Sequence, residues 1–155
     1  MTIPVASTAV LVMDKVLSEL ATVMVGTGEN GKDVNVVDGA DYSAMYSDEI
    51  WVQDIKDGLT RIPVMRAGRK KREETYQLVI KVRTVRVDRR DSRVAVFAHF
   101  AAVEDWLANN PGLGLNIPTL RATTIDWSFE SNYEEGNRGW RSTITISPTI
   151  ESRLA

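Results

Sequence analysis

The residues of this chain that could carry out acid–base or metal chemistry are few and scattered. The 155 residues include one histidine, His99, and no cysteine. A zinc site takes three or four His, Cys or carboxylate ligands, so this composition argues strongly against one. No nucleophile or orienting acid lies in a recognisable motif beside His99. We therefore expect His99 to be a packed or hydrogen-bonded side chain and not a general base.

The acidic residues also lack the arrangement of a catalytic or metal site. Adjacent pairs occur at Asp48-Glu49, Glu73-Glu74, Glu104-Asp105 and Glu134-Glu135. Neighbouring side chains on a strand face opposite sides, so Glu73 and Glu74 would not converge on a substrate. Asp33, Asp38 and Asp41 lack the residue order of a calcium loop. The sequence thus indicates no catalytic residues, no metal ligands and no cofactor, and we expect a protein that is not an enzyme.

A glycine-rich segment, 26–31, has the composition of a phosphate-binding loop but the wrong context. Its sequence is Gly-Thr-Gly-Glu-Asn-Gly. The dinucleotide fingerprint follows a strand and opens a helix, whereas this segment follows a predicted helix. We therefore interpret it as a turn-rich loop.

The most distinctive feature is a basic cluster, which we define as Arg66, Arg69, Lys70, Lys71 and Arg72. Residues 66–93 carry eleven of the nineteen basic residues and four acids, a balance of +7. The rest of the chain carries eight basic and seventeen acidic residues, a balance of −9. Segregated charge steers and orients association between molecules. The cluster therefore indicates a docking surface.

Three interpretations of the basic cluster are compatible with the sequence. Clustered Lys and Arg supply salt-dependent affinity for nucleic acid. However, only Tyr76 provides an aromatic ring nearby, and a single-strand platform interleaves several. The pI of about 5.5 also argues against a dedicated nucleic-acid binder. An acidic protein surface, or a solvated loop without a partner, fits the cluster better.

Length and composition are those of a globular domain, and we expect residues 1–155 to form one domain. The N-terminus lacks the basic region of a signal peptide, and Asp14, Lys15 and Glu19 interrupt the apolar stretch there. The longest uncharged run, 106–120, is shorter than the roughly 18 residues of a membrane helix. We expect a soluble protein without a membrane segment.

Two amphipathic helices are predicted. The first runs from a cap at Ser7 or Thr8 to about Val25, with Gly26 as its stop. Its expected core stripe is Val10, Met13, Leu17, Leu20 and Met24. The second begins at a cap formed by Asp91 or Ser92 and ends before Pro111. Its expected core stripe is Val96, Phe100, Val103 and Leu107.

The second helix is also apolar on its opposite side. That side carries Val94, Ala98, Ala101 and Ala102, with Asp105 as its main charge. A helix that is apolar almost all round is usually covered on both sides. A neighbouring subunit could provide the second cover at Ala98, Ala101 and Ala102. Packing of the first helix there is the other explanation, because alanine permits close helix contact.

The remaining periodicity predicts strands. Short strands are expected at 34–37 and at 49–56, the latter ended by Asp57-Gly58, and 62–65 reads as an edge or connecting segment. A long strand follows the basic cluster with Tyr76, Leu78, Ile80 and Val82 on one face. Val85 and Val87 lie in the opposite phase, which predicts a bulge near Arg83-Thr84 or the strand's end there. Segments 123–133 and 140–147 predict a C-terminal hairpin.

This order of elements resembles the tail terminator proteins of long-tailed bacteriophages, also called tail completion or tail-to-head joining proteins. The resemblance lies in the segment 68–76 (Gly-Arg-Lys-Lys-Arg-Glu-Glu-Thr-Tyr), in the strand that follows it, and in the helix containing 101–107 (Ala-Ala-Val-Glu-Asp-Trp-Leu). It implies an α/β fold of the α+β type. We expect a small mixed, mostly antiparallel sheet with two main helices on one side and a C-terminal β-hairpin.

The resemblance also implies a function and partners. Such proteins form hexameric rings that cap the tail tube, stop its polymerisation and join it to the head connector. The implied partners are other copies of the chain, the tail tube protein and the connector or neck protein, with transient proximity to DNA and no membrane. The implied location is the virion tail or neck, and the host cytoplasm during assembly. Neck, head-closure and tail-tube proteins of similar size share small mixed folds and remain alternatives.

Overall fold

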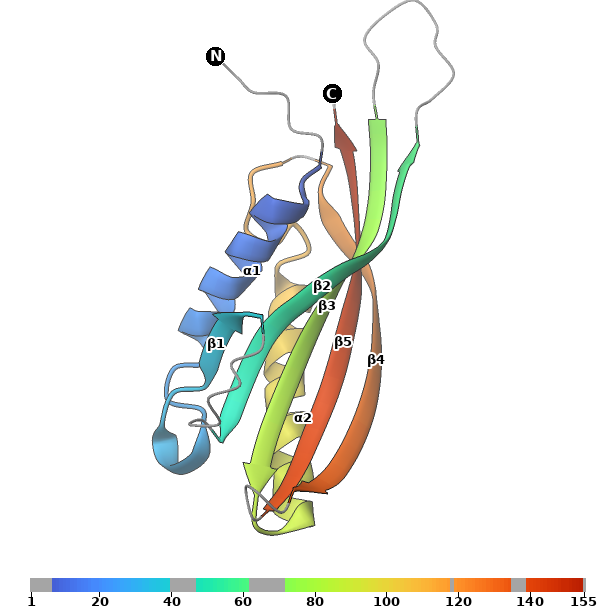
Figure 1. Ribbon diagram of the computed structural model, residues 1–155. Coiled ribbons are helices and arrows are strands. Elements are labelled where there is room, and N and C mark those ends of the chain that lie inside the picture. The colour runs from blue at the N-terminus through green and yellow to red at the C-terminus, as the bar shows by residue number, and fades with distance from the viewer. Residues whose placement is uncertain (1–6, 40–46, 62–71, 118, 135–138, 155) are drawn as a thin grey trace, which may run out of the picture.

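Five strands form one sheet, and two helices pack on it (Figure 1). The computed structural model describes residues 7–39, 47–61, 72–117, 119–134 and 139–154. The helices are α1 (Ala9–Val23) and α2 (Arg89–Asn109), with a short 3-10 turn η1 (Glu29–Gly31) after α1. The strands are β1 (Asn35–Asp38), β2 (Asp48–Arg61), β3 (Arg72–Arg86), β4 (Arg121–Glu134) and β5 (Gly139–Leu154).

The sheet is mixed and mostly antiparallel, as the sequence predicts. Its strand order is β1-β2-β3-β5-β4, and the β1–β2 pair is the parallel one. The β4–β5 pair forms the predicted C-terminal hairpin. Buried side chains of α1, α2 and the inner face of β3 and β5 belong to one hydrophobic cluster. Both helices therefore cover the same face of the sheet, and the opposite face is free of helices (Figure 1).

The centre of the core is the β3–β5 pair. Tyr76, Leu78, Ile80 and Val82 of β3 are buried on the helix side, as predicted. The predicted bulge or strand end near Arg83-Thr84 is wrong. The β3–β5 pairing keeps one register from Arg72 to Arg86, and Thr84 continues the buried face. A hydroxyl is accommodated there because Thr84 Oγ1 donates to the backbone carbonyl of Ser92 at 2.8 Å.

The irregularity lies in β2 instead. The β2–β3 register shifts between Val52 and Asp54 and again between Lys56 and Leu59. Asp57 has φ 55°, a left-handed conformation that Asp tolerates better than most residues. Asp57-Gly58 was predicted to end the strand, but it forms a bulge through which β2 continues to Arg61. The predicted segment 62–65 lies outside the described residues.

Helix α1 turns most of its predicted stripe toward the core, because Leu20 and Met24 are buried and Met13 and Leu17 are half-buried against it, and the prediction is wrong at Val10. Its buried residues are Val12, Val16 and Leu20, followed by Met24, whereas Val10 is 67% exposed. Thr8 precedes the helix, but its side chain does not cap it. The Thr8 backbone N–H and hydroxyl donate to Glu74 Oε1 of β3 at 2.9 and 2.7 Å. This long-range contact fixes the first turn, and so it sets which side of α1 faces the sheet.

Helix α2 begins earlier than predicted. Asp88 is the N-cap and accepts a hydrogen bond from the Arg90 backbone N–H at 3.1 Å, in place of the predicted Asp91 or Ser92. Ser92 is buried and donates to Ser142 Oγ of β5 at 2.8 Å. The predicted stripe of Val96, Phe100, Val103 and Leu107 is buried. Neither α1 nor α2 has the length and apolar character required to cross a membrane.

The carboxylate of Glu74 joins α1 to two strands. Besides Thr8, it accepts a hydrogen bond from Ser152 Oγ of β5 at 3.4 Å. Burial raises the pKa of Glu74, but the hydrogen bonds from Ser7, Thr8 and Ser152 outweigh burial and hold this pKa below its ordinary value. A carboxylate at a helix N-terminus also interacts favourably with the helix dipole. Glu74 is therefore ionised in the folded protein and anchors α1.

We predict that Glu74→Gln lowers the free energy of unfolding at pH 7 by about 1–2 kcal/mol, because charge-assisted hydrogen bonds become neutral ones. A lowered folded-state pKa stabilises the protein above the unfolded-state pKa, and this stability is lost as the pH falls through the folded-state value. The difference between wild type and Glu74→Gln should therefore shrink in acid. Urea unfolding at neutral and acidic pH measures it. The control is Glu73→Gln, at the neighbouring, half-exposed glutamate, and it should change the free energy of unfolding little. Equal effects of the two variants would contradict this role of Glu74.

Candidate interaction surfaces

His99 lies inside the molecule and contacts an acid. Its Nε2 is 2.7 Å from Asp48 Oδ2, and the side chains of His99 and Asp48 are 5% and 2% exposed. The Arg86 guanidinium contacts both carboxylate oxygens of Asp48, with Nη2 at 3.0 Å from Oδ2. The prediction of a hydrogen-bonded histidine is confirmed. No sequence motif indicates its acid partner, because Asp48 is 51 residues away along the chain.

The Asp48, Arg86 and His99 side chains form what we call the Asp48 network. Burial raises the pKa of Asp48, but hydrogen bonds from His99 and Arg86, together with the Arg86 charge, hold this pKa below its ordinary value. The network joins the start of β2, the end of β3 and the middle of α2. Such burial leaves no room for a substrate beside His99, so the arrangement is structural. Among the described residues, no group of His, Asp and Glu side chains could hold a metal ion.

The fold partly cancels the charge segregation seen along the sequence. Arg83 pairs with Glu49, and Arg86 pairs with Asp48 and lies 3.7 Å from Glu29. These two arginines belong to the basic region 66–93, and their partners are acids from the preceding part of the chain. Arg83 also lies over the Trp51 ring, 5.5 Å from its centroid. Arg83 and Arg86 therefore stabilise the subunit and contribute little to an external positive surface.

The described strand ends that flank the basic cluster in the sequence lie at one end of the sheet. Arg66, Arg69, Lys70 and Lys71 lie outside the described residues. Arg72 is the first residue of β3, and the structure describes its backbone but not its side chain. The chain leaves β2 at Arg61 and enters β3 at Arg72, and Arg61 pairs with Glu73 across the two strands. Both attachment points of the cluster are thus at the upper end of the sheet in Figure 1.

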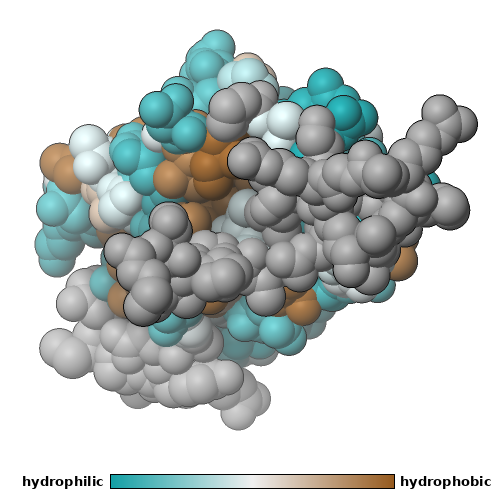
Figure 2. Space-filling model, turned by 90° about the horizontal axis from the view of Figure 1, so that it is seen from above, coloured by the Kyte–Doolittle hydropathy of each residue, from teal (hydrophilic) through white to brown (hydrophobic). Residues whose placement is uncertain are grey.

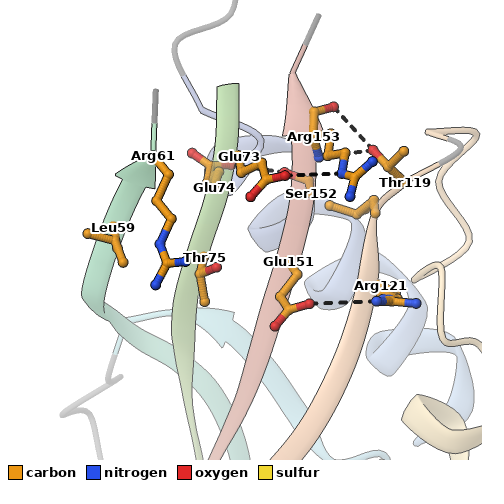
Figure 3. A pocket seen from close by; sticks show the side chains of 11 residues that line it. Leu59, Arg61, Glu73, Glu74, Thr75, Thr119, Arg121, Glu151, Ser152 and Arg153 are labelled. Atoms are coloured by element: carbon orange, nitrogen blue, oxygen red, sulfur yellow. Dashed lines mark hydrogen bonds and ion pairs between the residues drawn. The ribbon is translucent and has the colours of Figure 1, made fainter. Parts of the chain in front are cut away.

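A shallow pocket of about 640 Å³ lies beside these attachment points. Its lining includes Leu59, Arg61, Thr75, Thr119, Glu151 and Arg153 (Figure 3). The charged side chains point across the strands toward one another, and Glu73 pairs with Arg153 at 3.4 Å. Exposed pairs of this kind contribute little free energy and can exchange partners. Figure 2 looks onto this end of the molecule, where hydrophilic residues border a hydrophobic area.

The second side of α2 is exposed. Ala98 and Ala101 are exposed, as is Val94 at 57%. Helix α1 packs over β1 and β2, whereas α2 packs over β3, β5 and β4. The explanation that α1 covers this side is therefore wrong. Ala102 was assigned to the same side, but it is half-buried and packs against the core.

Aromatic residues border this exposed side where α2 meets β4. Phe97 is 36% exposed, and Trp127 of β4 is 51% exposed. Their ring centroids are 5.9 Å apart in an edge-to-face arrangement, and both rings contact Phe100. We call Val94, Phe97, Ala98, Ala101 and Trp127 the α2 face. The alternation of β4 indicates that Trp127 faces the helices, but the sequence does not show that it lies at the sheet's rim.

The other exposed feature is the edge of the sheet. Strand β4 pairs with β5 on one side, and no described strand pairs with its other side. An open edge offers backbone donors and acceptors to another chain. The edge carries Asp126 and Glu130, both exposed, and charge of this kind opposes unwanted strand addition.

Comparison with known proteins gives a structural likeness but no family. No family model matches the sequence, and no curated protein matches it. Among solved structures, the chain is similar to a chain in the virion of a native gene transfer agent particle. The TM-score is 0.40 and the sequence identity 16%, over 91% of this chain and 92% of that chain. At these values the functional argument rests on the surfaces described above.

We predict that Asp48→Asn lowers the free energy of unfolding by about 3 kcal/mol, because the largely buried Arg86 loses its closest counter-ion and keeps only the more distant Glu29. Urea unfolding measures the change. Asp54→Asn is a matched control on the same strand, exposed, and should stay within about 0.5 kcal/mol of wild type. If Asp48→Asn also left the stability unchanged, the Asp48 network would not hold α2 on the sheet.

Proposed function

We propose that this chain is a phage virion structural protein that works by assembly and not by catalysis. The observation that carries the proposal is the α2 face. Contiguous exposed apolar and aromatic side chains mark sites of protein–protein contact. Here they border a helix whose opposite stripe forms the core, and Phe97 and Trp127 remain 36% and 51% exposed although their rings pack against Phe100.

Within that class, we propose a tail terminator. The resemblance in segment 68–76 and in the helix containing 101–107 supports this role. A terminator would form a hexameric ring that caps the tail tube, stops its polymerisation and joins it to the head connector. A ring needs two different patches on each subunit, so that one meets the other and the rotation closes. The α2 face and the charged end of the sheet are two such patches.

The basic cluster would contact an acidic surface of the tube end or of a neighbouring subunit. Its attachment to the charged end of the sheet supports this role, because that end already carries Arg61 and Arg153 beside the pocket. Complementary charge would fix which end of the ring meets the tube. The proposed location is the virion tail or neck, with assembly in the host cytoplasm.

The decisive experiment is native mass measurement with negative-stain imaging of the purified protein, alone and mixed with tail tubes. Six-fold rings at one end of the tubes are the expected result, with tube lengths that stop increasing once the protein is added. Protein bound only to head connectors would assign it to the neck or head-closure proteins. Protein that incorporates along the tube would assign it to the tail-tube proteins.

We predict that reversing Arg69, Lys70 and Arg72 together to Glu abolishes capping, because the cluster would then repel an acidic partner surface. Tail length in the same imaging assay is the measurement. A control variant carries Lys32→Glu and Lys56→Glu, two exposed lysines away from the cluster, and should cap normally. Normal capping by the triple variant would show that the cluster is a solvated loop.

The nucleic-acid alternative makes a different prediction for the wild-type protein. A module that binds through the basic cluster would bind DNA at low salt, and its affinity would fall steeply as salt rises. The described part of the charged end does not favour this, since Arg153 and Arg121 are near Glu73 and Glu151. We expect no DNA binding at low salt, and steeply salt-dependent binding would favour the alternative.

A further inference from the structure

We infer that the α2 face binds the α2 face of a second copy, with the two helices antiparallel, and that the free protein is a two-fold dimer. This contact differs from a ring contact, because a ring joins two unlike patches whereas a two-fold axis joins a patch to itself. The inference does not depend on the proposed tail terminator role. It concerns the protein before it meets a tube or a connector, and the dimer would have to dissociate before the α2 face could take part in a ring.

The charges along α2 are the first observation. Arg90 and Arg93 lie in its N-terminal half, and Glu104 and Asp105 lie in its C-terminal half. All four are exposed, and none makes an ion pair with another described residue. The helix dipole favours acids at the start and bases at the end, so these four residues oppose it. The arrangement becomes favourable when a partner brings complementary charge.

An antiparallel second copy brings that charge. Helix α2 has 21 residues, and its midpoint lies at His99. Rotation about a two-fold axis at this midpoint places Arg93 opposite Asp105 of the second copy and beside its Glu104, and the two acids of the first copy beside the second copy's Arg93. Arg90 then lies near the same acidic end. A parallel arrangement would instead bring arginine beside arginine and acid beside acid, so the charge order selects the antiparallel one.

The apolar residues at the middle of the face fit the same axis. Phe97 of one copy faces Ala101 of the other, and the two-fold axis repeats this contact with the copies exchanged. At both places a large side chain packs against a small one. Val94 and Ala98 lie beside this contact, and small side chains let two helices approach to about 8–10 Å. Trp127 of β4 extends the apolar area on one flank of the helix. Both the size pattern and the charge pattern are therefore self-complementary.

The open edge of β4 is less suited to self-pairing. If two β4 strands paired antiparallel about Ser128, Asp126 of one copy would lie opposite Glu130 of the other. Like charges directly opposite each other on paired strands are destabilising. No comparable repulsion arises at the centre of the α2 face. The second copy is thus expected on the helix side of the sheet.

The chain has no cysteine, so single introduced cysteines report the geometry directly. We expect Ala98→Cys to form a disulfide-linked dimer under mild oxidation, because residue 98 lies next to the axis. Ala108→Cys is the matched control on an exposed alanine of the same helix. Its two copies would be about 30 Å apart in the antiparallel dimer, too far to be bridged. Denaturing gels without reductant measure both.

Charge exchange tests the same contact without cysteines. Arg93→Glu alone and Glu104→Arg alone should each weaken dimerisation about tenfold, because the two-fold axis repeats every changed pair. The double variant Arg93→Glu with Glu104→Arg should recover most of the affinity. Sedimentation equilibrium over a concentration series gives the dissociation constants. Thermal unfolding of each variant checks that the fold is retained.

Three results would overturn the inference. The first is a wild-type protein that stays monomeric at high concentration. The second is equal disulfide formation by Ala98→Cys and Ala108→Cys, as expected for a parallel pair or for random collision. The third is a double variant as weak as the single ones. None of these needs a tail tube, so failure of the dimer is distinguishable from failure of the capping experiment.

Discussion

The carboxylate of Asp48 determines how the helix side of this protein is arranged. It is buried where β2 begins, and it is neutralised by Arg86 at the end of β3 and by His99 in the middle of α2. Removing a carboxylate from water costs several kcal/mol unless partners replace the lost hydration, so the three groups must stay together in the folded state. The orientation of α2 about its own axis follows from the position of His99.

That orientation leads directly to the exposed surface. With His99 turned toward the sheet, Val96, Phe100 and Val103 enter the core, and Phe97, Ala98 and Ala101 face outward. At the other end of the sheet, Glu74 has the same role for α1 through Thr8. Two buried carboxylates thus hold the two helices on one face of the sheet. The exposed surface of the described residues includes an apolar helix face and a charged sheet end, and both suit contacts with other proteins.

Particular residues show how far sequence reasoning extends. The alternation in β3 and the hairpin of β4 and β5 predict the sheet correctly, because the side-chain period of a strand is local and the core selects one face. The stripe of α1 is predicted correctly except at Val10, because apolar residues occur on two sides of this helix and the sequence does not show that Val12 and Val16 form its buried centre. The Asp57-Gly58 pair was read as a stop, although the chain passes through it as a bulge. For the α2 face, the sequence supplied the alanines and the structure supplied Phe97 and Trp127.

The sequence alone determined most of the elements that the chain forms. The apolar periods give the helices and strands, because they depend on residue type and short-range spacing, and the absence of cysteine leaves no thiolate ligand or thiol nucleophile. Only the tertiary structure decided which charges cancel inside the subunit and which side of each helix is exposed. Those outcomes depend on pairs such as Asp48–His99 and Thr8–Glu74, 51 and 66 residues apart along the chain, and no local pattern specifies which distant group will neutralise a buried charge.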